Sequence, residues 1–263
     1  MAAISKLNVG LALGSGGARG YAHIGVIKTL EANNIPIDIV TGCSIGSVIG
    51  GFYAAGLTID DIENIALTTK GRKVFAILAE PRIKQRVSGK EQVEDFLENY
   101  LSGKTFKDCC LPFAALATDV TNGESVVLNS GRLTPAIRAS ISVPGAFKPI
   151  SIDGKLLADG GLAAPVPVKT ARDMGADVVI AVNLDSYYHA DKWPASLPNI
   201  TSKSLSIMSK NLASYDCADA DVVIDINVGN VRWFEFSKAQ SKIDAGEKAA
   251  LAMMTKIKNI VNK

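Results

Sequence analysis

The sequence predicts an α/β fold in which helices cover both faces of a mainly parallel central sheet. Short apolar runs alternate along the chain with segments whose apolar residues recur at helical spacing, which is typical of parallel sheets with helical crossovers. The 263 residues are 48% hydrophobic and 21% charged, a composition that supports a large core and excludes a disordered or fibrous protein. No internal repeat is visible, and α/β folds of this length often form one domain, so we expect a single domain over residues 1–263.

The individual elements follow from periodicity and turn signals. The expected strands are short apolar runs: Val9 to Leu13, Ile37 to Thr41, Phe113 to Asp119, Glu124 to Leu128, Val178 to Leu184 and Val222 to Ile226. The expected helices are Tyr21 to Asn33, Gly46 to Ala55, Asp60 to Thr68, Glu91 to Leu101 and a C-terminal amphipathic helix at about 243–260. A helical segment is also expected before each of the runs at Val178 and Val222. Asn122-Gly123 and Asp153-Gly154 predict turns, and the irregular stretch from Asp185 to Thr201 predicts a loop.

Charge and composition exclude several classes of partner. The formal net charge is only +2, so we expect no nucleic-acid partner. No run reaches the roughly 18 apolar residues of a membrane span, and Met1 to Gly10 lacks the pattern of a secretory signal. A reduced, cytoplasmic protein without a zinc site is expected, because the cysteines show no Cys-x-x-Cys pairing and the sequence has only two histidines: Cys43, Cys109, Cys110, Cys217, His23 and His189.

The strongest local signal is a G-x-S-x-G pattern, Gly42-Cys43-Ser44-Ile45-Gly46. It follows an apolar strand and opens a helix of small residues, which is the context of a nucleophile elbow. A serine on such a sharp turn projects its hydroxyl above the sheet edge, and bulkier side chains at Gly42 and Gly46 would collide there. The helix that follows points its N-terminus at a developing anion. The alternative is that Ser44 only caps this helix, since serine is a preferred N-cap residue.

A glycine-rich segment, Gly14-Ser15-Gly16-Gly17-Ala18-Arg19-Gly20, joins the first strand to the first helix. Backbone N–H groups in such a loop converge on an anion, either a phosphate or the oxyanion of an acyl-transfer intermediate. The dinucleotide fingerprint G-x-G-x-x-G fails because Arg19 takes the third glycine position, and no Gly-Lys-Ser/Thr of a P-loop follows. The next strand brings Ser44 to the same sheet edge, which favours the oxyanion; a tight turn without a ligand is the alternative.

The base that would activate Ser44 is not an obvious histidine. His23 precedes the serine and is expected to pack on the first helix, whereas His189 is either a triad base or a bystander, of which we favour the bystander. A carboxylate within hydrogen-bond reach can replace histidine. Asp159 follows an apolar run and precedes Gly160 and Gly161, and near its reference pKa of about 3.9 it is ionised at neutral pH. The alternative for Asp159 is a turn residue.

Together these motifs resemble those of the patatin-like phospholipase family. The family's G-G-G-x-R-G loop lines up with residues 15–20, its G-x-S-x-G with 42–46 and its D-G-G/A with 159–161. The similarity runs from about Val9 to Ile226 and extends to residues 18–25, 139–144 and 165–167. One departure is Ser15, where the family usually has glycine; a serine there narrows the loop or requires a negative φ.

The resemblance implies a three-layer α/β/α sandwich and a lipid acyl hydrolase with a Ser–Asp dyad. Ser44 would be the nucleophile and Asp159 the proton acceptor, and the backbone N–H groups of Gly16 and Gly17 would form the oxyanion hole. Arg19 would brace this loop or face a phosphate, and its position favours bracing. The other motif residues would support the geometry: Ser15, Gly20, Gly42, Gly46, Gly160 and Gly161.

The substrate implied by the resemblance is a fatty-acyl ester, such as a phospholipid or lysophospholipid, with neither a metal ion nor a cofactor. Two other classes of function remain open. One is a catalytically weak regulatory or acyl-binding module with the same fold, since fold alone does not fix function. The other is a Ser-His-Asp esterase that uses His189.

Two segments are candidates for contact with the substrate's surroundings. Residues 70–90 hold seven basic residues against the single acidic Glu80, with Phe75 among the apolar residues between them. This composition predicts a peripheral contact with an anionic membrane, and the alternative is a solvated flap over the cleft, because Pro81 interrupts the segment. The aromatic stretch from Tyr187 to Trp193 is a second candidate lid.

Overall fold

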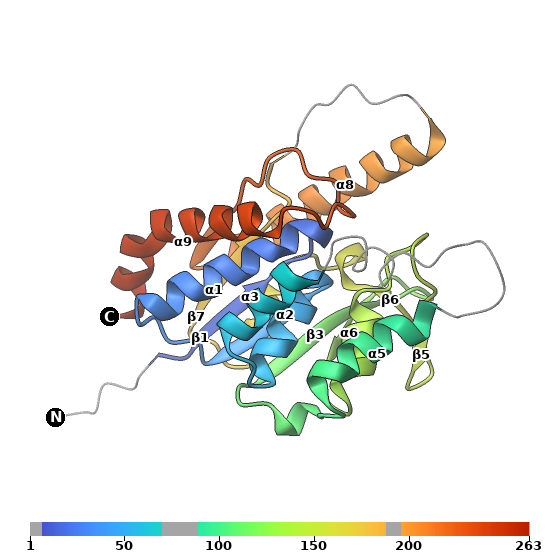
Figure 1. The fold of residues 1–263 in the computed structure, drawn as a ribbon, viewed down its shortest axis with the longest axis horizontal. Coiled ribbons are helices and arrows are strands. Elements are labelled where there is room, and N and C mark those ends of the chain that lie inside the picture. Colours follow the sequence, from blue (N-terminus) through green and yellow to red (C-terminus); the bar gives the residue numbers. More distant parts are fainter. Residues whose placement is uncertain (1–6, 70–88, 188–195, 263) are drawn as a thin grey trace.

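The protein is built around one central sheet. It is seen in a computed structural model that describes residues 7–69, 89–187 and 196–262 (Figure 1). Eight strands of these residues form the sheet in the order β5-β6-β3-β2-β1-β7-β8, and β4 also pairs with β3. The strands are β1 (Val9–Leu13), β2 (Ile39–Cys43), β3 (Phe113–Asp119), β4 (Ser125–Leu128), β5 (Ile150–Ile152), β6 (Lys155–Asp159), β7 (Val178–Asn183) and β8 (Val222–Asp225).

Most strand pairs are parallel. The strands β3, β2, β1, β7 and β8 all run in one direction. At the other end of the sheet, β4 and β6 are antiparallel to β3, and β5 is antiparallel to β6. The mainly parallel sheet predicted from the sequence is therefore confirmed, and the loops after its parallel strands share one edge.

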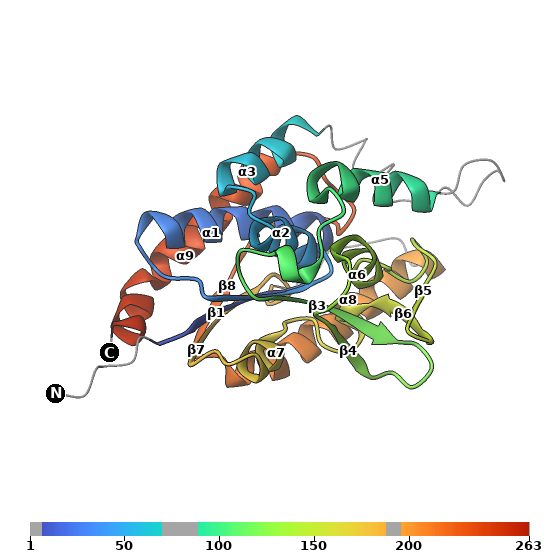
Figure 2. The same ribbon diagram turned by 90° about the horizontal axis from the view of Figure 1, so that it is seen from below.

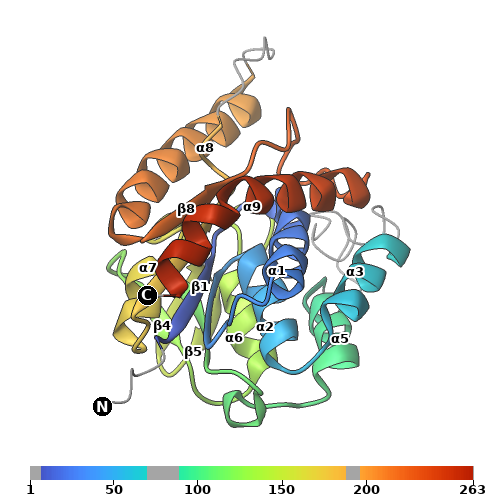
Figure 3. The ribbon, with the colours of Figure 1, turned by 90° about the vertical axis from the view of Figure 1, so that its left-hand side faces the viewer.

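Helices cover both faces and complete three layers. In Figure 2, α7 and α8 lie on one side of the sheet and the other labelled helices lie on the opposite side. The helices are α1 (Ala22–Ala32), α2 (Ile45–Ala54), α3 (Ile59–Thr68), α5 (Gly89–Leu101), α6 (Leu133–Ser140), α7 (Val168–Asp173), α8 (Leu197–Asp216) and α9 (Ala239–Val261). α1 and α9 lie side by side (Figures 1 and 3) and touch through backbone, since a Cβ on Gly25 would lie 2.0 Å from the Ile243 carbonyl oxygen.

The alternation of side chains along β1 explains the two unequal cores. Val9, Leu11 and Leu13 are fully buried in the larger core, which includes residues of α1, α2 and α9. Ala12 points to the smaller core, whose helical residues come from α7 and α8. Since every second residue of a strand faces the same layer, a strand with apolar residues at all positions must be covered on both sides.

The hairpin between β5 and β6 was predicted correctly. Asp153 and Gly154 both have positive φ, at 49° and 76°, as a two-residue hairpin turn requires. This turn sets the pairing of β5 with β6, and β6 pairs on its other side with β3, where Leu157 lies opposite Asp119. Two residues later, Asp159 ends β6 opposite Ala117, inside β3.

Two boundaries differ from the prediction. The stretch from Asp185 to Thr201 was predicted to be a loop, but α8 begins at Leu197. Many of the apolar residues of α8 are exposed, so it lacks the strong inward-facing periodicity that indicates a helix. The C-terminal helix begins at Ala239 rather than near residue 243, since its first turn includes the buried Lys242.

Candidate active site

The serine turn connects β2 to α2. Ser44 is the single residue between them and has φ 52° and ψ −124°, a conformation that is strained for a residue other than glycine. Its side chain makes no capping hydrogen bond to α2, while its backbone N–H donates to Oγ of Ser140 at 2.9 Å. The geometry is therefore that of a nucleophile elbow, and the alternative that Ser44 merely caps the helix does not hold.

The two glycines of this motif allow backbones to approach each other. A Cβ on Gly46 would lie 2.2 Å from the carbonyl oxygen of Leu13, at the end of β1. A Cβ on Gly42 would lie 2.5 Å from the carbonyl oxygen of Gly46 itself. Since these contacts involve backbone rather than flexible side chains, a larger residue at either position would displace the turn.

Asp159 reaches Ser44 because of strand register. Cys43, the last residue of β2, lies opposite Leu116 of β3, and Asp159, the last residue of β6, lies opposite the next residue, Ala117. The Ser44 hydroxyl donates to Oδ2 of Asp159 at 2.6 Å, although the two residues are 115 positions apart in the chain.

The glycines after Asp159 hold its carboxylate in place. The Gly161 N–H donates to Oδ1 of Asp159 at 2.8 Å, so each carboxylate oxygen has a partner. Gly160 passes so close to β3 that a Cβ there would lie 2.4 Å from the Leu116 carbonyl oxygen. The Asp159-Gly160-Gly161 motif therefore turns the chain at β3 while aiming the carboxylate at Ser44.

Burial changes the acidity of Asp159. Its side chain is inside the protein, with 5% of the residue exposed, and this desolvation raises its pKa to about 6. The hydrogen bonds from Ser44 and Gly161 act in the opposite direction and hold part of the rise back. The carboxylate is thus largely ionised at pH 7 but is a stronger base than the reference value suggests.

The glycine-rich loop lies beside the dyad. Gly17 has φ 56°, and a Cβ there would lie 2.3 Å from the Trp233 carbonyl oxygen, so only glycine fits. Ala18 N–H donates to that carbonyl at 2.6 Å and Arg19 N–H donates to the Gly16 carbonyl at 3.2 Å. The N–H groups of Gly16 and Gly17 have no acceptor among the residues that the structure describes.

The departure at Ser15 leaves the loop intact. Ser15 is not among the residues with positive φ, whereas Gly16 and Gly17 after it are. Its N–H donates to the Pro165 carbonyl at 2.8 Å and its hydroxyl donates to Asp185 at 3.3 Å. The loop thus makes its left-handed turn at glycines, and serine is compatible with an ordinary backbone conformation.

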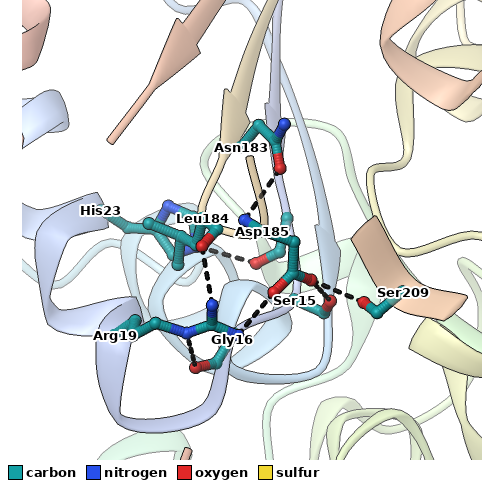
Figure 4. A network of polar contacts seen from close by, with 9 residues as sticks. Ser15, Gly16, Arg19, His23, Asn183, Leu184, Asp185 and Ser209 are labelled. Carbon is teal, nitrogen blue, oxygen red and sulfur yellow. Dashed lines mark hydrogen bonds and ion pairs between the residues drawn. The ribbon is translucent and has the colours of Figure 1, made fainter. Parts of the chain in front are cut away.

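Arg19 contacts the protein on both sides of this loop (Figure 4). It donates from Nε to the Gly16 carbonyl at 3.1 Å and from a terminal nitrogen to the Leu184 carbonyl at 2.9 Å. Its other terminal nitrogen lies 2.5 Å from a carboxylate oxygen of Asp185. Gly20, the last residue of this loop, lies against α2, since a Cβ there would lie 2.3 Å from the Ile45 side chain.

Asp185 was not predicted as a site residue, although it joins three parts of the site (Figure 4). One carboxylate oxygen binds Arg19, and the other accepts hydrogen bonds from Ser15 and, at 2.6 Å, from Ser209 of α8. It lies two residues after the end of β7, which pairs with β1. The signal available in the sequence was two polar residues at the end of a buried strand, Asn183 and Asp185. The strand pairing that brings them to the glycine-rich loop is not visible in the sequence.

His23 is buried on α1, as predicted, and takes no part in the contact between Ser44 and Asp159. Its Nε2 lies 2.8 Å from the Gly14 carbonyl, which makes this nitrogen the donor. Burial lowers its pKa to about 4, so the ring is neutral at pH 7. His189 lies outside the described residues, as do residues 70–88 of the basic segment and most of the aromatic stretch after Tyr187.

Ser44 and Asp159 open into a cavity of about 160 Å³. Gly16, Gly17 and Arg19 line it on one side, and α8 contributes Leu205, Met208, Ser209 and Leu212 on another. The cavity therefore combines a hydroxyl, a carboxylate and unpaired N–H groups with an apolar wall. In the part of the chain that the structure describes, no cluster of three or more His, Cys, Asp or Glu side chains is arranged to hold a metal ion.

Comparison with known proteins identifies the family. Residues 11–172, more than half of the chain, match the patatin-like phospholipase family. The chain belongs to this family. An uncharacterized NTE family protein of Mycobacterium tuberculosis is 36% identical over 224 residues, which are 84% of this chain and 61% of that protein. The lysophospholipase nte1 of Emericella nidulans is 36% identical over 183 residues, 68% of this chain but only 12% of that protein.

Solved structures show the same fold. VipD from Legionella pneumophila has a TM-score of 0.59 at 14% identity, over 97% of this chain and 67% of VipD. The type III effector protein ExoU has a TM-score of 0.52 at 14% identity, over 98% of this chain and 54% of ExoU. These similarities confirm the α/β fold class of the patatin-like chain. Among its described helices, none combines the length and apolar character needed to cross a membrane.

Proposed function

We propose that the chain is a serine lipid acyl hydrolase that cleaves fatty-acyl esters through an acyl-enzyme on Ser44, with Asp159 as the base. The observation that carries the proposal is the 2.6 Å hydrogen bond from the Ser44 hydroxyl to the buried Asp159 carboxylate. A nucleophile needs a base within this distance, and a carboxylate whose pKa is raised to about 6 by burial accepts a proton more readily than an exposed one.

The first half of the reaction acylates the serine. Oγ of Ser44 attacks the ester carbonyl carbon while its proton passes to Oδ2 of Asp159. The carbonyl oxygen becomes an oxyanion, which accepts hydrogen bonds from the N–H groups of Gly16 and Gly17. Collapse of the tetrahedral intermediate breaks the bond to the alcohol, which leaves with the proton from Asp159. One such N–H donor typically contributes about 10²–10³ in turnover.

The second half regenerates the serine. Asp159, again ionised, takes a proton from a water molecule as the water oxygen attacks the acyl carbonyl. The same N–H groups stabilise the second oxyanion, and its collapse releases the fatty acid and returns the proton to Oγ of Ser44. Arg19 takes no proton in this scheme. Its contacts with Gly16 and Asp185 support the role of bracing the loop.

The proposed substrate is a phospholipid, a lysophospholipid or a simpler fatty-acyl ester. Family membership and the lysophospholipase relatives support a lipid substrate, and the apolar wall of the cavity suits an acyl chain. The chain spans 61% of the Mycobacterium relative and 12% of the lysophospholipase. Release of fatty acids from a panel of these three ester classes will define the headgroup and chain length.

A fluorophosphonate probe tests the nucleophile directly, because it reacts only with an activated serine. We expect covalent labelling of the wild type at Ser44 and none of Ser44→Ala, measured by intact mass. Ser47→Ala is the matched control, since Ser47 is also buried in α2 but its hydroxyl donates to the Ser44 carbonyl. A wild type that is neither labelled nor active on any ester would indicate the regulatory or acyl-binding module instead.

The dyad also predicts that His189 is dispensable. His189→Ala should retain the wild-type kcat/KM for a soluble ester, because Asp159 already occupies the position of the base. Collapse of activity in this variant, with the fold intact by circular dichroism, would support the Ser-His-Asp alternative.

A further inference from the structure

α8 exposes an apolar face to solvent. Its exposed apolar side chains include Leu197 at 78%, Met208 at 58%, Ile200 at 52% and Ile207 at 44%. Their spacing of three, seven and eight residues puts them on one broad side of the helix. The N-terminal part of α8 stands out from the body of the molecule (Figures 1 and 3). Clustered exposed apolar residues of this kind mark an interaction surface rather than a normal protein surface.

The opposite side of α8 fixes the helix to the site. Ser209 donates to Asp185, Ala213 is fully buried, and Asp216 accepts from the Val166 N–H at 2.9 Å. The exposed face is thus held in a defined orientation. This face also reaches into the molecule, because Met208, Leu205 and Leu212 line the cavity that holds Ser44. The apolar face therefore continues from the outside of the molecule to the dyad.

The charges of α8 favour an anionic partner. The helix carries Lys203 and Lys210 and has no acidic residue before Asp216. The Asp216 carboxylate accepts a hydrogen bond from the Val166 N–H. Viewed along the helix, the two lysines lie beside Ile207 at the border of the apolar face. Apolar residues bordered by lysine are the pattern of a helix that lies in a lipid interface, with its cations at the headgroups.

We propose that the exposed face of α8 docks on a lipid surface and delivers the substrate to the cavity. Leu197, Ile200 and Ile207 enter the interface, and the acyl ester passes Leu205 and Met208 to reach Ser44. A lipid surface fits better than a second copy of the chain, because a protein seated over Met208 would cover the entrance that the substrate needs. The inference rests on the proposed function, and it concerns a surface different from the basic segment at residues 70–90.

Vesicle binding tests the docking separately from catalysis. In a Ser44→Ala background, which leaves the lipid uncleaved, the triple variant Leu197→Ser, Ile200→Asn and Ile207→Ser should bind vesicles of phosphatidylcholine and phosphatidylglycerol about tenfold or more weakly. Cosedimentation measures the effect. The matched control is Leu67→Ser with Leu251→Ser, which removes similarly exposed side chains, at 47% and 58%, from α3 and α9. It should bind like its parent.

A soluble ester keeps the two proposals apart. With Ser44 restored, the triple variant should hydrolyse a monomeric short-chain ester as the wild type does, but should lose activity on the vesicles. Hydrolysis of the soluble ester without vesicle binding would overturn the docking and leave the proposed function standing. Vesicle binding through α8 without hydrolysis of any ester would support the docking and overturn the proposed function. A wild-type dimer that the triple variant breaks, with vesicle binding unchanged, would assign the face to a second copy.

Discussion

At the scale of single residues, the burial of Asp159 determines the acidity of its carboxyl group. Among the described residues, the carboxylate accepts hydrogen bonds from two donors, the Ser44 hydroxyl and the Gly161 N–H, and 5% of Asp159 is exposed to solvent. Desolvation raises its pKa to about 6, so the folded protein binds this proton more tightly than the unfolded chain does. The ionised form, which the proposed mechanism uses as the base, is therefore unfavourable for folding.

Asp159→Asn should abolish turnover and stabilise the fold at pH 7. A pKa of about 6 against a reference value of 3.8 corresponds to a destabilisation of about 3 kcal/mol when the group is ionised. This penalty is present above pH 6 and disappears as the pH falls from about 6 to about 4, where both states are protonated. Urea unfolding at pH 7 and pH 4 measures it. Asp153→Asn in the exposed hairpin turn is the control, and equal stabilities of Asp159→Asn and wild type at pH 7 would contradict the argument.

The same pKa predicts the acid limb of the pH profile. Only ionised Asp159 accepts the Ser44 proton, so kcat/KM on a soluble ester should fall about tenfold per pH unit below pH 6. The neutral His23, whose pKa is near 4, should leave no step of its own close to pH 6.5. A midpoint near the reference value of aspartate would show that Asp159 is solvated in the working enzyme.

The sequence predicted the local parts of the site better than its environment. Gly42 to Gly46 and Asp159 to Gly161 encode their turns through residue type, which is why the motifs could be placed without a structure. The pKa of Asp159 depends on what β3, α6 and the glycine-rich loop exclude around it, and no local pattern carries that information. Asp185 was missed for a related reason, since its contacts depend on the pairing of β7 with β1.

At the scale of elements, the segment between β8 and α9 holds the glycine-rich loop in place. Its Trp233 carbonyl accepts the Ala18 N–H and packs against Gly17. The segment is held in turn by Lys242 of α9, whose amino group donates to the carbonyls of Glu235, at 3.0 Å, and Ser237. Lys242 is 2% exposed, and burial lowers its pKa. A buried lysine thus connects the C-terminal helix to the site through two backbone carbonyls.

Lys242→Met should loosen the glycine-rich loop while keeping the hydrophobic stem of the side chain. The two carbonyls lose their donor, which should cost on the order of 2 kcal/mol in thermal unfolding. We expect kcat for a soluble ester to fall more than KM changes, because the loop acts on the oxyanion rather than on the bound ester. Lys258→Met, at an exposed position of the same helix, should change neither quantity. A change in KM alone would mean that Lys242 acts through substrate binding.

Helices and strands could be predicted from the sequence where their apolar residues recur at a regular spacing. The strands and the helices α1, α2, α3, α5 and α9 were located within a few residues, since each has apolar residues at its own period. α8 was located only in part. A helical segment was expected before Val222, but the start of α8 falls in the stretch predicted to be a loop, because the apolar residues there face outward. The prediction of one domain, the cytoplasmic location and a lid or membrane contact at residues 70–90 or 187–193 stay predictions.

At the scale of the whole molecule, the dyad is assembled from two strands that approach the same stretch of β3 from opposite directions. β2 is parallel to β3 and β6 is antiparallel to it, and they end opposite the neighbouring residues Leu116 and Ala117. Ser44 and Asp159 therefore belong to separate stretches of chain that are joined through the exposed turn at Asn122 and Gly123. Neither stretch contains both reactive groups.

This arrangement makes the protein suitable for division into two polypeptides. A break between Asn122 and Gly123 leaves Ser44, the proposed nucleophile, on one fragment and Asp159, the proposed base, on the other. On reassembly, β3 of the first fragment must pair with β4 and β6 of the second. Each fragment alone should be inert, whereas coexpression of the two should restore ester cleavage in proportion to their association. Hydrolysis would then report whether two fused proteins have met inside a cell.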